Sequence, residues 1–219
     1  MLLQSTRHTE PLQPQWLPSL LGSLDVVTAA ATQVVSTADA KTHCRVEISD
    51  DDTYIGTLVQ AAQRWCESGS ERGFGGDRQF LTATYSTPVI GFWQGPLKLP
   101  RPPLQSVSSV KYYATDGVLT TLATDQYIVR TPWRGQGTVE RAPLVVWPVV
   151  QPDRRFPVVI QFVCGYGAAS TVPATIVHAI KLLVGHWYER REPVVGGIVS
   201  KEIAFTVNSL LEAEGYGCY

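Results

Sequence analysis

The residue pattern changes along the chain, and this change limits the folds that the chain can adopt. From Phe80 to about Gly167 the sequence consists of short runs rich in β-branched and aromatic residues, separated by Gly, Pro and Asp. Such runs favour strands, and the residues between them favour turns. Asp116-Gly117 falls between two of the runs and supplies the residues that a tight hairpin turn requires. The pattern predicts a small antiparallel β unit in the middle of the chain.

The part of the chain before this unit, residues 24–79, is predicted to hold a strand or extended lead-in followed by two helices. Its first residues, 24–35, are mostly β-branched or small, with one charge among them. Ser36 offers a capping oxygen to a short helix. The acidic run 50–52 would cap a longer helix, whose apolar residues recur at three- and four-residue steps as far as Glu67.

Helical periodicity returns in residues 168–219, which we expect to form C-terminal helices and a tail. Thr171 is expected to cap the first helix, with Pro173 in its first turn, where a missing N–H costs nothing. An apolar face follows at helical spacing from Ile176 onward. Because short neighbouring helices must bury such faces together, we expect this helix to pack with residues 36–67.

These patterns together predict an α+β fold. A small helical bundle from the N- and C-terminal helices would carry an inserted antiparallel β unit, residues 80–167. Residues 1–23 lack periodicity and contain three prolines, so we expect an extended N-terminal arm. A chain of 219 residues can bury about 70% of its surface, so the core needs neither a metal nor disulfides. No apolar run approaches the length of a membrane span, and no membrane contact is expected.

The amino-acid composition indicates which kinds of partner the chain could have. Charged residues make up only 17% of the chain, which nevertheless contains six Trp and nine Tyr. This balance suits a subunit whose surface is partly covered by other subunits, and equally a monomer of low charge. The net charge of −1 excludes a strongly basic nucleic-acid binder, so any contact with DNA should be weak. The four cysteines are scattered and no secretion signal is evident, which predicts synthesis in a reducing cytoplasm.

No catalytic, metal or cofactor site is predicted. His178 and His186 are badly spaced for a shared metal, and the chain has neither a GxSxG nucleophile turn nor a phosphate-binding glycine loop. Two alternatives to an interaction protein remain open. One is a small hydrolase using His178 and Asp153. The other is a β-rich ligand-binding module that uses exposed aromatic residues of the β unit: Trp93, Tyr112, Tyr113 and Trp133.

Three segments together resemble a known family. They are GPLKLPRPPLQSVSSVKYY at 95–113, CGYG at 164–167 with the following VPATIVHAIKLLVGHWYERRE, and TADAKTHCRVEISDDDTYIGTLVQAAQRWCE at 37–67. In this order they resemble the gp6-like adaptors, which are head-tail connector proteins of tailed phages. The resemblance spans about residues 24–215.

The resemblance implies a structural role and no enzyme activity. Copies would assemble into a ring beneath the portal protein, usually of twelve subunits, within the neck of a virion made in a bacterial cytoplasm. The ring would extend the DNA channel, contact the passing DNA weakly, and offer a platform for a stopper or tail protein.

Apolar and basic groups near the two ends of the chain are the candidate interface residues. The arm has too few neighbours in sequence to bury its large apolar side chains, and the last segment follows a Gly-Gly pair. Exposed apolar groups of this kind are useful when they dock into another subunit. The predicted set is Trp16, Leu17, Leu20, Leu21, Trp187, Tyr188, Arg190, Arg191, Phe205, Leu210 and Leu211.

Overall fold

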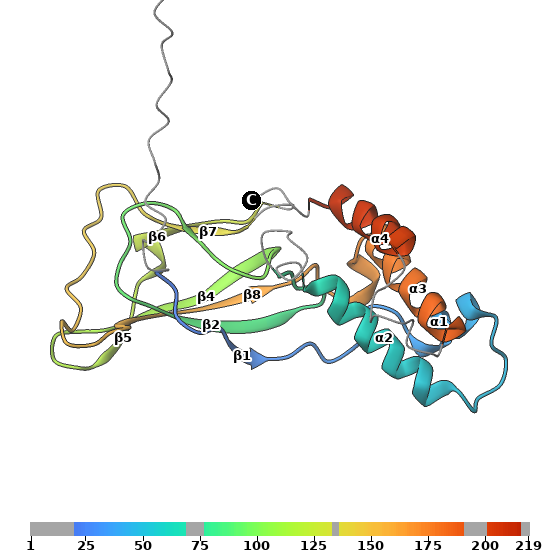
Figure 1. Cartoon of the computed structure of the whole chain (residues 1–219). Coiled ribbons are helices and arrows are strands. Elements are labelled where there is room, and N and C mark those ends of the chain that lie inside the picture. The colour runs from blue at the N-terminus through green and yellow to red at the C-terminus, as the bar shows by residue number, and fades with distance from the viewer. Residues whose placement is uncertain (1–19, 69–76, 133–135, 191–200, 216–219) are drawn as a thin grey trace, which may run out of the picture.

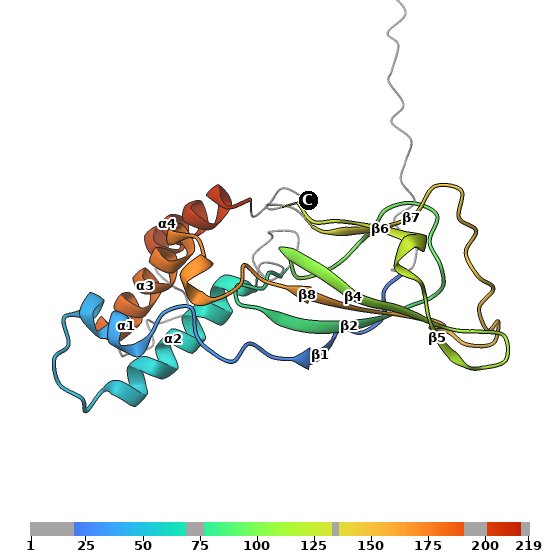
Figure 2. The same cartoon turned by 180° about the vertical axis from the view of Figure 1, so that it is seen from behind.

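A computed structural model describes residues 20–68, 77–132, 136–190 and 201–215, and it confirms the predicted α+β fold. Helices gather at one end of the molecule, and antiparallel sheets extend from them to the other end (Figure 1). The reverse view shows the same division (Figure 2). The described helices are α1 (Thr37–Cys44), α2 (Asp52–Glu67), α3 (Ala174–Glu189) and α4 (Lys201–Ala213).

Within the described residues, the β part consists of two antiparallel sheets. The larger sheet has the strand order β1-β2-β8-β4-β5, and the smaller has the order β3-β7-β6. In the larger sheet the strands are β1 (Asp25–Thr28), β2 (Ala83–Val89), β8 (Val158–Cys164), β4 (Leu104–Tyr113) and β5 (Leu119–Thr121). In the smaller they are β3 (Leu97–Lys98), β7 (Thr138–Arg141) and β6 (Tyr127–Arg130).

The larger sheet is not built from the middle of the chain alone. Strand β1, which precedes the helices in sequence, pairs antiparallel with β2, so Val26 lies opposite Tyr85. Residues 20–23 of the predicted arm also lie along this sheet. The Leu20 carbonyl accepts a hydrogen bond from the Ile90 N–H at 2.9 Å, and Leu21 packs against the core of the β part.

The helical end has its own core. Helices α2 and α3 pack against each other, and α4 packs on α3. The buried side chains between them include Ile55 and Val59 from α2, Ile180 from α3, and Val207 and Leu211 from α4. The apolar face of each helix thus packs against that of its neighbour, so hydrophobic burial holds α2, which precedes the sheets in sequence, together with the C-terminal helices α3 and α4.

The helix starts agree only partly with the predicted caps. Ser36 caps α1 as predicted, because its side chain accepts a hydrogen bond from the Asp39 N–H at 3.0 Å. The acidic run before α2 acts differently. Asp51 is the N-cap residue but makes no capping hydrogen bond with its side chain, which instead accepts one from the Tyr188 hydroxyl at 2.6 Å. Asp52 forms an ion pair with Lys41 at 2.6 Å, so the acidic run connects α2 to α1 and α3.

The predicted cap of α3 is wrong. Thr171 ends a short 3₁₀ segment, Ala169–Thr171, and its hydroxyl donates to the carbonyls of Tyr166 and Ala168. The N-cap position belongs to Pro173, one residue before the first turn. Proline suits this position because it lacks the N–H that would be unsatisfied there.

The hairpin between β4 and β5 forms at the predicted turn. Gly117 has a φ of 81°, which favours glycine, and its N–H donates to the Ala114 carbonyl at 2.8 Å. The Asp116 carboxylate accepts from the Val118 N–H at 2.9 Å. The hairpin projects at the end of the sheet away from the helices (Figure 1).

We therefore expect the hairpin tip to tolerate change. Replacing Asp116-Gly117 with a longer Gly-Ser loop removes one exposed side-chain hydrogen bond and should cost about 1 kcal/mol of unfolding free energy. Circular dichroism should show unchanged helical content, and urea titration gives the free energy. Loss of the helical signal would contradict the separation between the hairpin and the helical core.

Candidate functional site

The proposed hydrolase residues do not share a site. His178 lies exposed on α3 in the helical end. Asp153 lies exposed in the connection before β8, whose first residues are at the end of the sheet away from the helices. Among the described residues, no group of three or more His, Cys, Asp or Glu side chains could hold a metal ion. The alternative of a hydrolase with this pair therefore has no geometric support.

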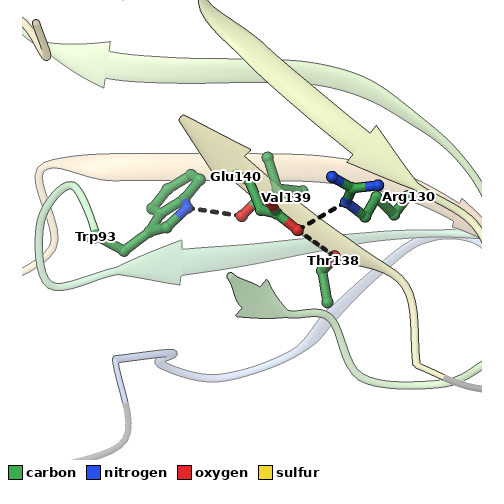
Figure 3. Close-up of polar contacts among 5 residues, drawn as sticks. All are labelled: Trp93, Arg130, Thr138, Val139 and Glu140. Atoms are coloured by element: carbon green, nitrogen blue, oxygen red, sulfur yellow. Dashed lines mark hydrogen bonds and ion pairs between the residues drawn. The ribbon is translucent and has the colours of Figure 1, made fainter. Parts of the chain in front are cut away.

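The aromatic residues of the β part form packing contacts rather than an exposed platform. Trp93 is buried, and its Nε1–H donates to the Val139 carbonyl at 2.7 Å (Figure 3). Trp147 stacks on Phe92 with ring centroids 4.6 Å apart, and its Nε1–H donates to the Trp93 carbonyl. Tyr112 and Tyr113 are half-buried, while Trp133 lies outside the described residues. The ligand-binding alternative required exposed tryptophans, and Trp93 does not meet that requirement.

The predicted interface residues of the arm are described only at its end. Trp16 and Leu17 lie outside the described residues. Leu20 is 44% exposed, and Leu21 is half-buried against the β core, where it forms an isolated bridge with Val89. Among the predicted interface residues of the arm, Leu20 is therefore the described one whose side chain is exposed to a partner.

The residues predicted at the end of α3 divide between the core and the surface. Trp187 and Tyr188 are half-buried and pack against the helical core. Tyr188 also contacts α2, through its hydrogen bond to Asp51 and a tilted ring contact with Tyr54 at 6.3 Å. Arg190 is exposed just after α3, and Arg191 lies outside the described residues.

The three predicted residues of the last segment lie in different environments on α4. Phe205 is 73% exposed, Leu210 is half-buried, and Leu211 is fully buried in the helical core. The assignment of Leu211 as an interface residue is therefore corrected, because its side chain is already covered by α3 and its neighbours. Phe205 is a large apolar side chain that remains exposed on the described part of this helix.

The structure also exposes apolar residues that the sequence patterns did not single out. Val26 and Val27 of β1 are 59% and 52% exposed. Leu144, Val146 and Val149 are largely exposed in the connection between β7 and β8. The sequence around these residues is typical of an ordinary strand or loop. Only the strand order of the folded chain places β1 at the edge of its sheet.

A polar cavity of about 770 Å³ lies where the helical end meets the sheet. Helix α2 forms one wall, strands β1 and β2 form another, and residues 29–33 border it. Arg101 and Asp77 form an ion pair at 3.1 Å within its lining. Glu67 of α2 also lines the cavity and accepts hydrogen bonds from Gln63 Nε2 at 3.2 Å and from the Phe80 N–H at 3.3 Å.

Burial raises the pKa of Glu67 above its ordinary value, although these two hydrogen bonds oppose the rise. A carboxyl whose pKa is raised by folding favours the protonated folded state, so its contribution to stability is lost as pH rises through the folded-state pKa. We expect Glu67→Gln to gain stability relative to the parent chain as pH rises from about 4 to about 7. Urea unfolding of both proteins across this range measures the difference. A constant difference would show that the pKa of Glu67 is not raised.

Comparison with known proteins gives a likeness in fold. No family model and no curated protein matches the sequence. A chain from the neck of an empty gene transfer agent (GTA) particle, computed with C6 symmetry, superposes with a TM-score of 0.68 at 20% identity, covering 88% of this chain and 95% of that one. The chain has the fold of this neck protein.

Two further solved structures agree with it. A chain of the virion of a native gene transfer agent particle has a TM-score of 0.67 at 21% identity, with 87% of this chain and 93% of that one covered. A chain of the neck of the native particle, computed with C12 symmetry, gives 0.62 at 19% identity, covering 88% and 94%. Within the described part of the chain, no helix is long and apolar enough to cross a membrane.

Proposed function

We propose that the chain is a structural subunit of a virion neck, with no enzyme activity, in a tailed phage or a similar particle. The observation that supports this proposal most directly is the likeness to a GTA neck chain over 88% of this chain and 95% of that one. A match of this extent includes both the helical end and the sheets. The gp6-like adaptor family remains the more specific proposal, and it rests on the sequence segments given above.

The neck subunits would form a ring, which we propose to contain twelve copies. The similar neck structures were computed with C6 and C12 symmetry, which supports a rotational arrangement. A ring needs two different contact surfaces on each subunit, because each copy meets one neighbour on either side. The described chain exposes separate apolar groups on β1, on the β7–β8 connection and on α4, so it offers more than one such surface.

The ring would lie beneath the portal protein and receive a stopper or tail protein on its other face. DNA would pass through its channel with weak contact, because a chain with a net charge of −1 offers few contacts to the phosphates. Many phosphate contacts would instead hold the DNA in the channel. Leu20, Arg190 and Phe205 are the described candidates for contacts with these partners. Synthesis in the bacterial cytoplasm and assembly into the virion neck belong to the same proposal.

Electron microscopy and native mass spectrometry of the purified full chain test this function. We expect rings of about twelve copies, and we expect proteomics of purified particle necks to detect the chain. Phe205→Ser should weaken association with the ring or a neck partner, whereas Ser209→Ala, another exposed position of α4, should not. A chain that stays monomeric at all concentrations and is missing from purified necks would overturn the proposal.

A further inference from the structure

Strand β1 lies at one edge of the larger sheet. It is the first strand in the order of the larger sheet, and in the described part of the chain it pairs with β2 alone. Asp25, at the start of β1, is the one charge of the strand, and residues 26–35 contain neither a charge nor a proline, the residue types that usually protect an edge strand from further pairing. The pairing shifts register between Val26 and Thr28, which limits the regular edge to a short length. Because Val26 and Val27 are more than half exposed, covering this edge would bury apolar surface.

A cavity for side chains adjoins this edge. Val26 lines the 770 Å³ cavity together with residues 29–33, Tyr85 of β2 and Arg64 of α2. An extended segment added beside β1 could bond to its backbone and place side chains in the cavity. Strand addition works in this way, because the main chain supplies affinity and pockets for alternate side chains supply specificity.

The chain contains a segment suited to this edge. Residues 1–10, MLLQSTRHTE, contain no proline and include two leucines and two threonines, whereas residues 11–19 contain Pro11, Pro14 and Pro18. Turning back directly onto its own strand would place residues 11–18 beside 21–28, with three residues that lack an N–H for the ladder. Pairing within one chain by such a hairpin is therefore unfavourable.

The proline-containing stretch can instead carry the first ten residues to another copy. The described part of the arm begins at Leu20, whose carbonyl accepts a hydrogen bond from the N–H of Ile90. Ile90 lies just beyond the end of β2. Nine extended residues span up to about 30 Å, and ten more span about 33 Å. A folded chain of this length has a radius of gyration of about 17 Å, so an adjacent subunit in a ring lies within reach.

We propose that the free edge of β1 and the adjoining cavity bind residues 1–10 of a neighbouring copy as an added strand. This inference rests on the ring proposed above and specifies one of its contacts. Each subunit would donate its arm to one neighbour and receive an arm from the other, which is the head-to-tail arrangement that a closed ring requires.

Disulfide trapping between two distinguishable full-length chains tests the pairing. In a Cys44→Ser, Cys218→Ser background, one chain carries Val27→Cys, and a co-expressed chain with a larger tag carries either Gln4→Cys or Thr6→Cys. Mild oxidation of the co-assembled protein should give a cross-linked species of mixed mass. Ile48→Cys, at a residue that is 60% exposed between α1 and α2, replaces Val27→Cys as the control and should cross-link at least tenfold less.

A charge at the edge gives a second measurement. Val26→Lys together with Val27→Lys should reduce the assembled fraction at least tenfold at a fixed concentration, whereas Ile48→Lys should leave it unchanged. Rings that form without the cross-link and tolerate both lysines would overturn the strand addition and leave the neck function intact. Cross-linking only within one chain, when both cysteines are placed on it, would also overturn it. Failure of the parent chain to form any ring would instead count against the proposed function.

Discussion

Ile180→Asp is expected to unfold the helical end of the protein. Ile180 is fully buried on α3, in the core that α2 and α4 complete. An aspartate there would lose the apolar contacts and bury a carboxyl group without a partner, at a cost of about 4–5 kcal/mol. Domains are stable by only about 5–15 kcal/mol, so this is a large part of the total. We expect a melting temperature lower by roughly 10 °C or more, measured by circular dichroism.

His178→Asp is the matched control for this experiment. His178 lies on the same helix only two residues earlier, but it is exposed. The same new charge there should change the unfolding free energy by about 0.5 kcal/mol or less. If Ile180→Asp melts at the same temperature as His178→Asp, the packing of α3 in the helical core is wrong.

The features predicted correctly from the sequence are those that neighbouring residues determine. Asp116-Gly117 makes its turn with residues of the same hairpin, and Ser36 caps the helix that follows it directly. The long apolar faces of α2 and α3 could likewise be recognised, because helical periodicity is visible within each segment. The α+β fold class follows from these local patterns.

The features that were missed depend on residues far apart in the sequence. Asp51 looks like a helix cap in the sequence, yet its carboxylate accepts a hydrogen bond from the hydroxyl of Tyr188, which lies more than a hundred residues away in sequence. Leu210 and Leu211 are consecutive apolar residues, but only Leu211 points fully into the core, because α4 packs on α3. No local pattern shows which strand will be a sheet edge, so the exposure of Val26 also required the strand order.

The burial of two α4 side chains determines how an interface role of this helix can be tested. Deleting residues 205–219 would remove Val207 and Leu211 from the helical core, so a loss of assembly could reflect unfolding rather than a lost contact. Substitution of the exposed Phe205 avoids this problem. A second contact at the end of α4 comes from Arg78, a residue that the sequence patterns did not single out.

Arg78 anchors the C-terminal end of α4. Its side chain is one of the largest fully buried groups in the chain, with 1% exposure. One Nη donates to the Glu214 carbonyl at 3.2 Å and the other to the Gly215 carbonyl at 2.7 Å, just beyond the end of α4. A positive charge at this position also interacts favourably with the helix dipole. The guanidinium thus satisfies buried carbonyls that α4 cannot satisfy by itself.

Arg78→Ala should therefore release α4. The substitution leaves those carbonyls without their charged donor and opens a cavity, which should cost about 3 kcal/mol or more. Hydrogen exchange should show faster exchange in residues 203–213, with smaller changes in α2. Arg78→Lys keeps the charge but not the two-pronged geometry, so an intermediate effect is expected. Arg130→Ala removes a largely exposed ion pair with Glu140 and should cost less than about 1 kcal/mol. If α4 keeps its protection in Arg78→Ala, apolar packing alone holds the helix and Arg78 is not its anchor.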